Sequence, residues 1–431
     1  MAAQPTPAGP ETLADKTYVP QLRWFICGLL FFASTINYID RQVLGLLKPV
    51  LEKDLGWNEA DYGWIVSAFQ IAYGLMMPIA GRVIDWLGVK VGYTLSVVVW
   101  SIAAMAHALA GNAFQFSAAR FSLGIGESAN FPAAIKAVAH WFPKRERAFA
   151  TGIFNSGTNI GALVAPWMVP ILAEHWGWRS AFVVTGSLGF LWIILWQIFF
   201  NDPEKHKLLS PEELALIRSD NEPDAASVPY SQVLGSRVAW AFIVGKFFTD
   251  PIWWFYLFWL PGFLASTYKL DLSHLGLPII VVYFATTFGS VFGGWLSSTM
   301  IRRGYTVNRA RKTAMLTCAL AVTSAMFVGE AGGNLWLAVA LISIAAASHQ
   351  GWSANLFTLP SDMLPKNAVG SVVGLGGMFG ALSGALVAPA IGYWLDYSNK
   401  SYGPLFIVAG SMYLVALGII HLIVPKIERT A

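Results

Sequence analysis

The chain alternates long apolar runs with short polar segments from residue 21 to residue 424. An apolar helix of about 20 residues is long enough to cross the ~30 Å hydrocarbon core of a bilayer. The pattern therefore predicts twelve membrane-spanning helices, in two groups of six separated by one long polar segment. The expected spans are 21–47, 59–81, 89–111, 113–137, 147–173, 178–200, 238–267, 275–301, 312–330, 332–362, 367–395 and 402–424.

The polar segments outside these spans divide the chain into five parts. Residues 1–20 are polar and proline-rich and lack the features of a cleaved signal peptide, so we expect a disordered tail. Residues 201–236 form a linker that contains "SPEELALIR", where Ser210 as N-cap and Pro211 at the first position predict a short surface helix. The expected domains are the tail at 1–20, a six-helix bundle at 21–200, the linker at 201–236, a second six-helix bundle at 237–424 and a tail at 425–431.

The composition supports a bilayer as the solvent of this chain. Hydrophobic residues make up 56% of it and charged residues only 12%, with a mean hydropathy of +0.55, whereas soluble domains carry about 25% charged residues. Both cysteines, Cys27 and Cys318, lie in apolar runs and are expected to pack there without forming a disulfide or a metal site. The expected fold is an all-α membrane protein.

The basic residues indicate how the chain is oriented. If both termini share one side, 20 of the 28 Lys and Arg residues fall on that side, five on the other and three inside spans. Basic residues accumulate in short cytoplasmic loops. We therefore expect both termini and the long linker in the cytoplasm, with Lys48 and Lys400 among the few cations of the opposite loops.

Three short repeats relate the two groups of spans. "GALVAP" occurs at 161–166 and 384–389, "SAN" at 128–130 and 353–355, and "FPK" at 142–144 matches "LPK" at 364–366. The offsets of 223, 225 and 222 are nearly constant, which indicates duplication of a six-span unit. A parallel repeat of this kind places a solute site between the halves, near the middle of the bilayer.

The loop after the second span reads "GRVIDWLGVK" and resembles the signature of the major facilitator superfamily. Its elements here are Gly81, Asp85, Gly88 and Lys90. The glycines permit a tight turn, and Asp85 can accept hydrogen bonds from a helix N-terminus or from an arginine of the next span, which would hold this end shut. The matching stretch of the second half has Ser298 in place of the acid, so a weaker lock is expected there.

Four ionisable residues lie inside the spans of the first half. Asp40 and Arg41 are adjacent in the first span, and Arg120 and Glu127 are seven residues apart in the fourth, about 10.5 Å along one helix face. Arg120 and Glu127 cannot touch directly, so each must pair elsewhere or line a wet cavity. Buried charges of this kind mark functional sites by default, and these four balance to zero. A carboxylate that either binds a proton or pairs with an arginine provides the competition that a proton-coupled carrier needs.

"NYIDR" at 37–41, "ARFSLGIGE" at 119–127 and "GRVIDWLGVK" together resemble the anion:cation symporter family of the major facilitator superfamily. "TDPIWWFYLFWLP" at 249–261 and the stretch at 348–370 are most similar to bacterial hexuronate transporters, which carry galacturonate or glucuronate. The resemblance implies the major facilitator fold, that Arg41 binds the substrate carboxylate, that Asp40 and Glu127 take protons, and that Arg120 takes part in coupling. It also implies a bacterial inner membrane.

Further polar residues in the spans suit a hydroxylated ligand, although helix–helix hydrogen bonding explains any one of them at least as well. The candidates are Tyr38, Gln70, Tyr73, Asn155, Thr158, Asn159, His349, Gln350, Trp352, Ser353 and Asn355. Lys246 and Asp250 are four residues apart in the seventh span and are expected to pair, either as a gate or to stabilise that span.

The sequence therefore favours a proton-coupled importer of a sugar-acid anion. The alternative is a carrier or exporter of another organic anion, such as an aldonate, glucarate or an aromatic acid. A membrane enzyme would need a nucleophile–base pair, a metal cluster or a phosphate loop, and a receptor would usually carry a sizeable soluble domain. Neither pattern occurs in the sequence. The expected partners are a small organic anion, protons and lipid, with no cofactor, no metal and no nucleic acid, and we expect the monomer to function.

Overall fold

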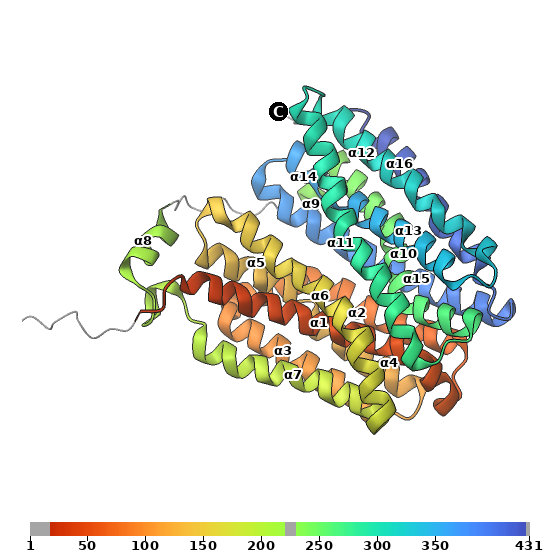
Figure 1. The fold of residues 1–431 in the computed structure, drawn as a ribbon. Helices are drawn as coiled ribbons and strands as arrows, with labels where there is room; N and C mark the ends of the chain where they lie inside the picture. Colours follow the sequence, from red (N-terminus) through yellow and green to blue (C-terminus); the bar gives the residue numbers. More distant parts are fainter. Residues whose placement is uncertain (1–17, 220–229, 428–431) are drawn as a thin grey trace, which may run out of the picture.

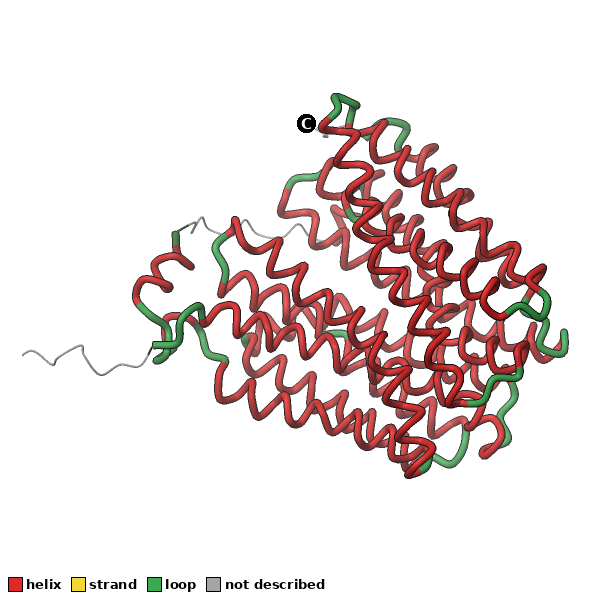
Figure 2. The backbone as a smooth tube through the Cα atoms, in the orientation of Figure 1, coloured by secondary structure: helices red, strands yellow, loops and turns green. Residues whose placement is uncertain are grey.

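The computed structural model describes residues 18–219 and 230–427, and this part of the chain is almost entirely helical (Figures 1 and 2). Of the two expected tails, residues 1–17 of the first and 428–431 of the second lie outside the described residues. The helices of the first half are α1 (Leu22–Leu55), α2 (Glu59–Leu87), α3 (Val89–Ala106), α4 (Ala113–Glu127), α5 (Asn130–Trp141), α6 (Lys144–Trp176) and α7 (Trp178–Phe199). Those that follow are α8 (Pro211–Arg218), α9 (Tyr230–Val233), α10 (Arg237–Tyr268), α11 (Leu272–Arg302), α12 (Val307–Val322), α13 (Leu335–Leu356), α14 (Thr358–Met363), α15 (Lys366–Tyr397) and α16 (Gly403–Ile423).

Within the described residues, ten helical segments are long and apolar enough to cross a membrane. Two of the expected spans are not among them. The fourth is interrupted, because α4 ends at Glu127 and α5 begins at Asn130, so the single helix expected at 113–137 is wrong. The seventh corresponds to α10, whose interior carries Lys246 and Asp250.

The fourth and tenth expected spans break at corresponding places. α4 gives way to α5 at the first "SAN" repeat, and α13 gives way to α14 just after the second. Proline lacks a backbone N–H and fits best in the first turn of a helix. Pro132 and Pro360 each occupy the third residue of the new helix, where the missing N–H breaks no hydrogen bond of that helix. Other prolines, such as Pro166 and Pro251, lie inside continuous helices, so proline alone does not predict either break.

Helix packing in the second half follows that in the first half. α1 packs along α6 in the first half, and α10 packs along α15 in the second. The "GALVAP" repeats lie in α6 and α15, where Gly161 faces α1 and Gly384 faces α10. The two halves meet chiefly where α2 lies against α15 and α6 against α11, and their helices diverge from that contact toward the end that carries α8, α9 and α14 (Figure 1). We call that end the terminal end, because both described ends of the chain lie there, and the opposite end the distal end.

The helix expected in the linker is present as α8. It begins at Pro211, and the Ser210 side chain accepts a hydrogen bond from the Glu213 N–H at 3.1 Å. Glu213 in turn accepts from the first N–H groups of α1 at Leu22 and Arg23, at 3.0 and 3.2 Å. A carboxylate stabilises a helix N-terminus, so α8 holds the linker against the start of the first bundle.

Candidate functional site

A cavity of about 280 Å³ lies between the two halves of the molecule. Its volume is close to the lower end of the ~300–1,000 Å³ range of small-molecule sites, so it suits a compact solute. Helices α1, α2, α5 and α6 form one wall, and the other is formed by α10, α11, α13, α15 and Phe357, which lies between α13 and α14. The polar residues on its surface are Tyr38, Arg41, Tyr73, Asn155, Thr158, Asn159, Lys246, Asp250, Ser290, His349, Gln350 and Ser353.

Arg41 provides the cation of the first wall. Its Nε donates to Oε2 of Glu127 at 2.5 Å, and Glu127 is fully buried behind it, at the end of α4. The guanidinium lies 4.6 Å from the ring centre of Tyr73 and 5.1 Å from that of Tyr38. An arginine has five N–H donors. With Nε directed at Glu127, the two Nη atoms can meet a ligand carboxylate through paired hydrogen bonds.

The other two charges of this half are buried behind the cavity wall. Arg120 is 1% exposed, and its Nη2 donates to the backbone carbonyl of Arg41 at 3.3 Å. Both carboxylate oxygens of Asp40 lack a hydrogen-bond partner among the described residues, as does the nearby hydroxyl of Thr185. Burying an ionised carboxylate without a partner costs far more than burying a protonated one, so Asp40 is suited to hold a proton.

The second wall carries an ion pair that faces the cavity. Nζ of Lys246 lies 2.8 Å from Oδ1 of Asp250, which is the pair that their spacing predicts. Beside it, the His349 ring stacks on Trp253 with centroids 5.0 Å apart, and His349 shares a 2.5 Å hydrogen bond with the Tyr413 hydroxyl. These contacts fix the orientation of His349 in the wall.

Three of the polar candidates lie away from the cavity surface. Trp352 is fully buried and packs edge-on against Tyr413, and the Asn355 amide donates to the backbone carbonyls of Gly293 and Gly351 at 2.9 and 3.0 Å. Gln70 is fully buried against Gly384. In this state Trp352 and Asn355 therefore do not line the cavity, because the Trp352 ring packs against Tyr413 and the Asn355 amide bonds to helix backbone. Helix periodicity alone could not separate them from Gln350 and Ser353.

The "GRVIDWLGVK" residues lie at the terminal end, between α2 and α3. Asp85 forms an ion pair with Lys136 of α5, where the sequence suggested an arginine or a helix N-terminus. Gly88 joins the two helices with a φ of 77°, a left-handed conformation that favours glycine. Lys90 donates to Asn201 and to the backbone of Gln197, and thereby ties α3 to the end of α7. Gly81 lies inside α2, where an added Cβ would meet open space.

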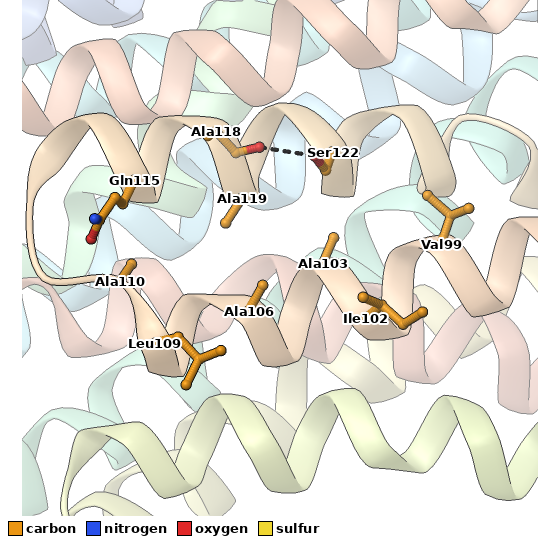
Figure 3. A pocket seen from close by; sticks show the side chains of 10 residues that line it. All are labelled: Val99, Ile102, Ala103, Ala106, Leu109, Ala110, Gln115, Ala118, Ala119 and Ser122. Atoms are coloured by element: carbon orange, nitrogen blue, oxygen red, sulfur yellow. Dashed lines mark hydrogen bonds between the residues drawn. The ribbon is translucent and has the colours of Figure 1, made fainter.

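A second hollow, of about 600 Å³, lies between α3 and α4 (Figure 3). Alanine and larger aliphatic side chains line most of it, and its two polar side chains are Gln115 and Ser122. The Ser122 hydroxyl donates to the Ala118 carbonyl of its own helix, as the dashed line in Figure 3 shows. The hollow has no charged group to hold a solute, so the smaller cavity between the halves is the better candidate site.

Comparison with known proteins identifies the family. Residues 30–388 match the model of the Major Facilitator Superfamily. The chain belongs to this superfamily. It is similar to the hexuronate transporter of Escherichia coli K12, at 31% identity over 94% of this chain and 96% of that protein. It is also similar to an E. coli K12 protein named "Probable galactarate/D-glucarate transporter", at 30% identity over 97% and 98% of the two chains.

Solved structures agree on the fold. A D-xylose–proton symporter has a TM-score of 0.74 at 16% identity, and the match covers 94% of this chain and 98% of that one. An inward-facing bacterial homologue of the human lysosomal transporter Spinster has a TM-score of 0.72 at 17% identity, covering 94% and 97%. This major facilitator protein is therefore a multi-pass membrane transporter, not an enzyme.

Sequence analysis missed a polar cluster that joins the transporter's halves at the distal end. Lys48, expected in a loop, is 1% exposed inside α1 and contacts Glu52 at 2.5 Å and Glu59 at 2.8 Å. Lys400, from the turn between α15 and α16, reaches the same two carboxylates at 3.1 and 3.3 Å. Asp396 accepts hydrogen bonds at 2.9 Å from the first N–H groups of α2, at Glu59 and Ala60. We call Lys48, Glu52, Glu59, Asp396 and Lys400 the distal latch.

Proposed function

We propose that this transporter is a proton-coupled symporter that imports a sugar-acid anion, most favourably a hexuronate such as galacturonate or glucuronate, by alternating access. The observation that carries the proposal is the position of Arg41, on the cavity wall with its Nε on the buried Glu127. The E. coli relative named a hexuronate transporter supports the substrate class. Protons are the coupling ion in this scheme, and no other cofactor is required.

The coupling follows from competition for Arg41. A substrate carboxylate that binds the guanidinium weakens its attraction for Glu127, and a carboxylate that loses a cation in a buried site binds a proton more readily. Substrate and proton are then taken up together and released together. Asp40 is a second proton carrier in this scheme, and Arg120, near both carboxylates, sets how readily each of them ionises.

The proposed topology has twelve spans in two pseudo-symmetric six-helix bundles, with both termini in the cytoplasm of a bacterium and the transporter in its inner membrane as a monomer. Two spans are added to the ten apolar ones. α10 has 32 residues, about 48 Å of helix, and its Lys246 and Asp250 face the cavity, away from lipid. α4 and α5 follow each other and complete the fourth crossing. The excess of basic residues on the side of the termini supports the orientation.

Uptake of labelled galacturonate into proteoliposomes with an imposed pH gradient tests the function. Arg41→Lys keeps a positive charge opposite Glu127 but loses the planar fork, so the fold should survive while uptake falls at least tenfold. Arg179→Lys is the matched control, because Arg179 is exposed and lies over Trp178 away from the cavity. The proposal would be overturned if the wild type showed no uptake, or if Arg41→Lys took up galacturonate as fast as the wild type.

Glu127→Gln tests the coupling separately. The variant cannot exchange a proton at this position, so it should still exchange internal for external galacturonate but no longer accumulate it from a pH gradient. If it accumulates substrate as the wild type does, Glu127 is not the coupling site.

The second candidate function is transport of another organic anion by the same site. The relative named for galactarate and D-glucarate favours it, because it covers as much of the chain as the hexuronate transporter does. Unlabelled aldonates, aldarates and aromatic acids should be compared as competitors of galacturonate uptake. A competitor that binds at least tenfold tighter than any hexuronate would replace the first candidate with the second.

A further inference from the structure

The two walls of the cavity present different charges to a ligand. On the first wall Arg41 lines the cavity while its carboxylate partner, Glu127, is fully buried behind it. On the second wall both Lys246 and Asp250 line the cavity. The first wall therefore offers a cation alone, and the second offers an ammonium donor together with a carboxylate acceptor.

One face of α10 links the two walls. Lys246, Asp250 and Trp254 are four residues apart and lie on the same side of the helix. The Trp254 ring centre is 5.9 Å from the Arg41 guanidinium, and Asp250 is one turn, about 6 Å, further along α10. A six-carbon acid held by Arg41 at one end therefore has its other end near Asp250.

The surroundings hold Asp250 in place. An added Cβ at Gly380 of α15 would collide with its carboxylate, so the glycine leaves the space that the carboxylate occupies. Lys246 is held on its other side by the Phe357 ring, 4.9 Å from Nζ. The pair on α10 is thus packed against Phe357, between α13 and α14, and against α15, and is not a freely moving surface contact.

These observations bear on the choice between a hexuronate, with one carboxylate, and an aldarate, with two. A hydroxyl group both donates and accepts hydrogen bonds, so it matches an ammonium and a carboxylate side by side. A second ligand carboxylate would meet the like charge of Asp250, and like charges brought together across an interface are strongly unfavourable. On the basis of the proposed function, we propose that the Lys246–Asp250 pair binds the hydroxyl end of the substrate. The pair thereby makes the transporter selective for polyhydroxy acids with one carboxylate over those with two.

The test compares galacturonate with galactarate, which share six carbons and one carboxylate for Arg41. The carbon at the other end closes a ring and carries a hydroxyl in galacturonate, whereas it is a second carboxylate in open-chain galactarate. Each is added unlabelled to compete with labelled galacturonate uptake in proteoliposomes, and the ratio of the two half-inhibitory concentrations is the readout. Wild type should favour galacturonate by about tenfold or more, and Asp250→Asn should shift the ratio toward galactarate by about tenfold, because the repelling charge is gone.

Two further variants make the result specific to the cavity. Glu330→Gln removes an exposed carboxylate of the same half, outside the cavity, and should leave the ratio unchanged. Lys246→Gln leaves Asp250 without its cation and should move the ratio further against galactarate. If Asp250→Asn is too weak in uptake, the same ratio is measured from ligand-induced shifts in the melting temperature of the purified variant.

A pair that only stabilised α10 or served as a gate would change the rate for both acids equally and leave the ratio as it was. An unchanged ratio in Asp250→Asn, or a wild type that prefers galactarate, therefore overturns the selectivity proposal. If wild type shows Arg41-dependent uptake of galacturonate, that failure leaves the proposed function intact. A wild type that transports neither acid overturns both.

Discussion

The two ends of this transporter hold their ion pairs in different ways. At the distal end, the latch residues come from both halves: Lys48, Glu52 and Glu59 from α1 and α2, Asp396 and Lys400 from α15 and the turn after it. At the terminal end, Asp85 pairs with Lys136 inside the first half. Arg311 pairs with Asp362 at 2.9 Å inside the second.

Further contacts join the two halves on the distal side of the cavity and reach the cavity itself. The Tyr62 hydroxyl donates to the Phe258 carbonyl at 2.8 Å, and the Ser67 hydroxyl donates to the Ala385 carbonyl at 2.8 Å. Toward the terminal end, the α2–α15 contact reaches Met77 and Gly377, and both residues line the cavity. The helices of the two halves diverge toward the terminal end (Figure 2).

The difference identifies which contacts must break for transport. The halves are joined on the distal side of the cavity and separate on the terminal side, as expected for a carrier whose site is open toward the termini. To open the other way, the distal latch has to release its buried charges. The pairs inside each half can remain intact while the halves move as bodies.

Lys48→Met should have the largest effect on this arrangement. It leaves the buried Glu59 and its neighbour Glu52 with only the half-exposed Lys400, and removing one partner of a buried ion pair costs about 3–5 kcal/mol. The distal end should open. A Ser67→Cys probe, buried between α2 and α15, should then react faster with a membrane-impermeant maleimide.

The matched control is Lys53→Met, which removes an exposed lysine from the same end of α1. It should leave the reactivity of the probe unchanged. The native cysteines, Cys27 and Cys318, are both buried and give a low background. Equal reactivity of the probe in Lys48→Met and wild type would show that the latch does not hold the distal end closed.

Asp396→Ala should have the next largest effect. Asp396 caps the N-terminus of α2 from the other half of the molecule, and loss of a helix cap costs about 0.5–2 kcal/mol. The Ser67→Cys probe should react faster than in wild type but slower than in Lys48→Met. Asp396→Asn keeps one acceptor and should fall between Asp396→Ala and wild type; the reverse order would contradict the capping role.

Asp85→Asn tests the terminal end in the same assay. Its pair with Lys136 is partly exposed and lies within one half, and such pairs contribute about 0–1 kcal/mol. The reactivity of the Ser67→Cys probe should therefore change little. Galacturonate uptake should nevertheless fall several-fold if Asp85 acquires a partner across the halves when the terminal end closes. Unchanged uptake would remove the gating role that the motif suggests.

The sequence predicted the local features of this fold more accurately than the contacts between distant segments. Apolar runs and the Ser210–Pro211 signal located the helices, and four-residue spacing located the Lys246–Asp250 pair, because these depend on neighbours along the chain. It also identified Arg41 and Glu127 as functional candidates, since an ionisable residue in an apolar run is conspicuous. It did not show that the two are partners, 86 positions apart.

The distal latch was missed for the same reason. Lys48 lies next to Pro49, where the apolar run weakens, so the sequence predicts it in a loop, although α1 continues to Leu55. Lys400 and Asp396 reach their partners only because the two halves meet at that end. Trp352 and Asn355 show the same limit from the other side: they share a helix with cavity residues, but α11 and α16 occupy the side they face.

Lys400→Gln should have the smallest effect, and its pH dependence separates it from the others. Burial of Lys400 lowers the pKa of its ammonium, but the carboxylates of Glu52 and Glu59 outweigh burial, and the pKa is raised above its usual value. A group whose pKa is raised by folding stabilises the structure fully below its unfolded pKa, ~10.4 for lysine, and the contribution is lost as the pH rises through the raised pKa. Because Lys400 is half-exposed, the difference from wild type should be about 1 kcal/mol or less. The difference between Lys400→Gln and wild type should stay constant from about pH 6 to 9, because lysine keeps its charge over that range, and should vanish only in stronger alkali. The measurement is the ratio of the Ser67→Cys probe's reactivities with and without Lys400. A difference that disappears near neutral pH would instead assign the effect to a carboxylate of the latch.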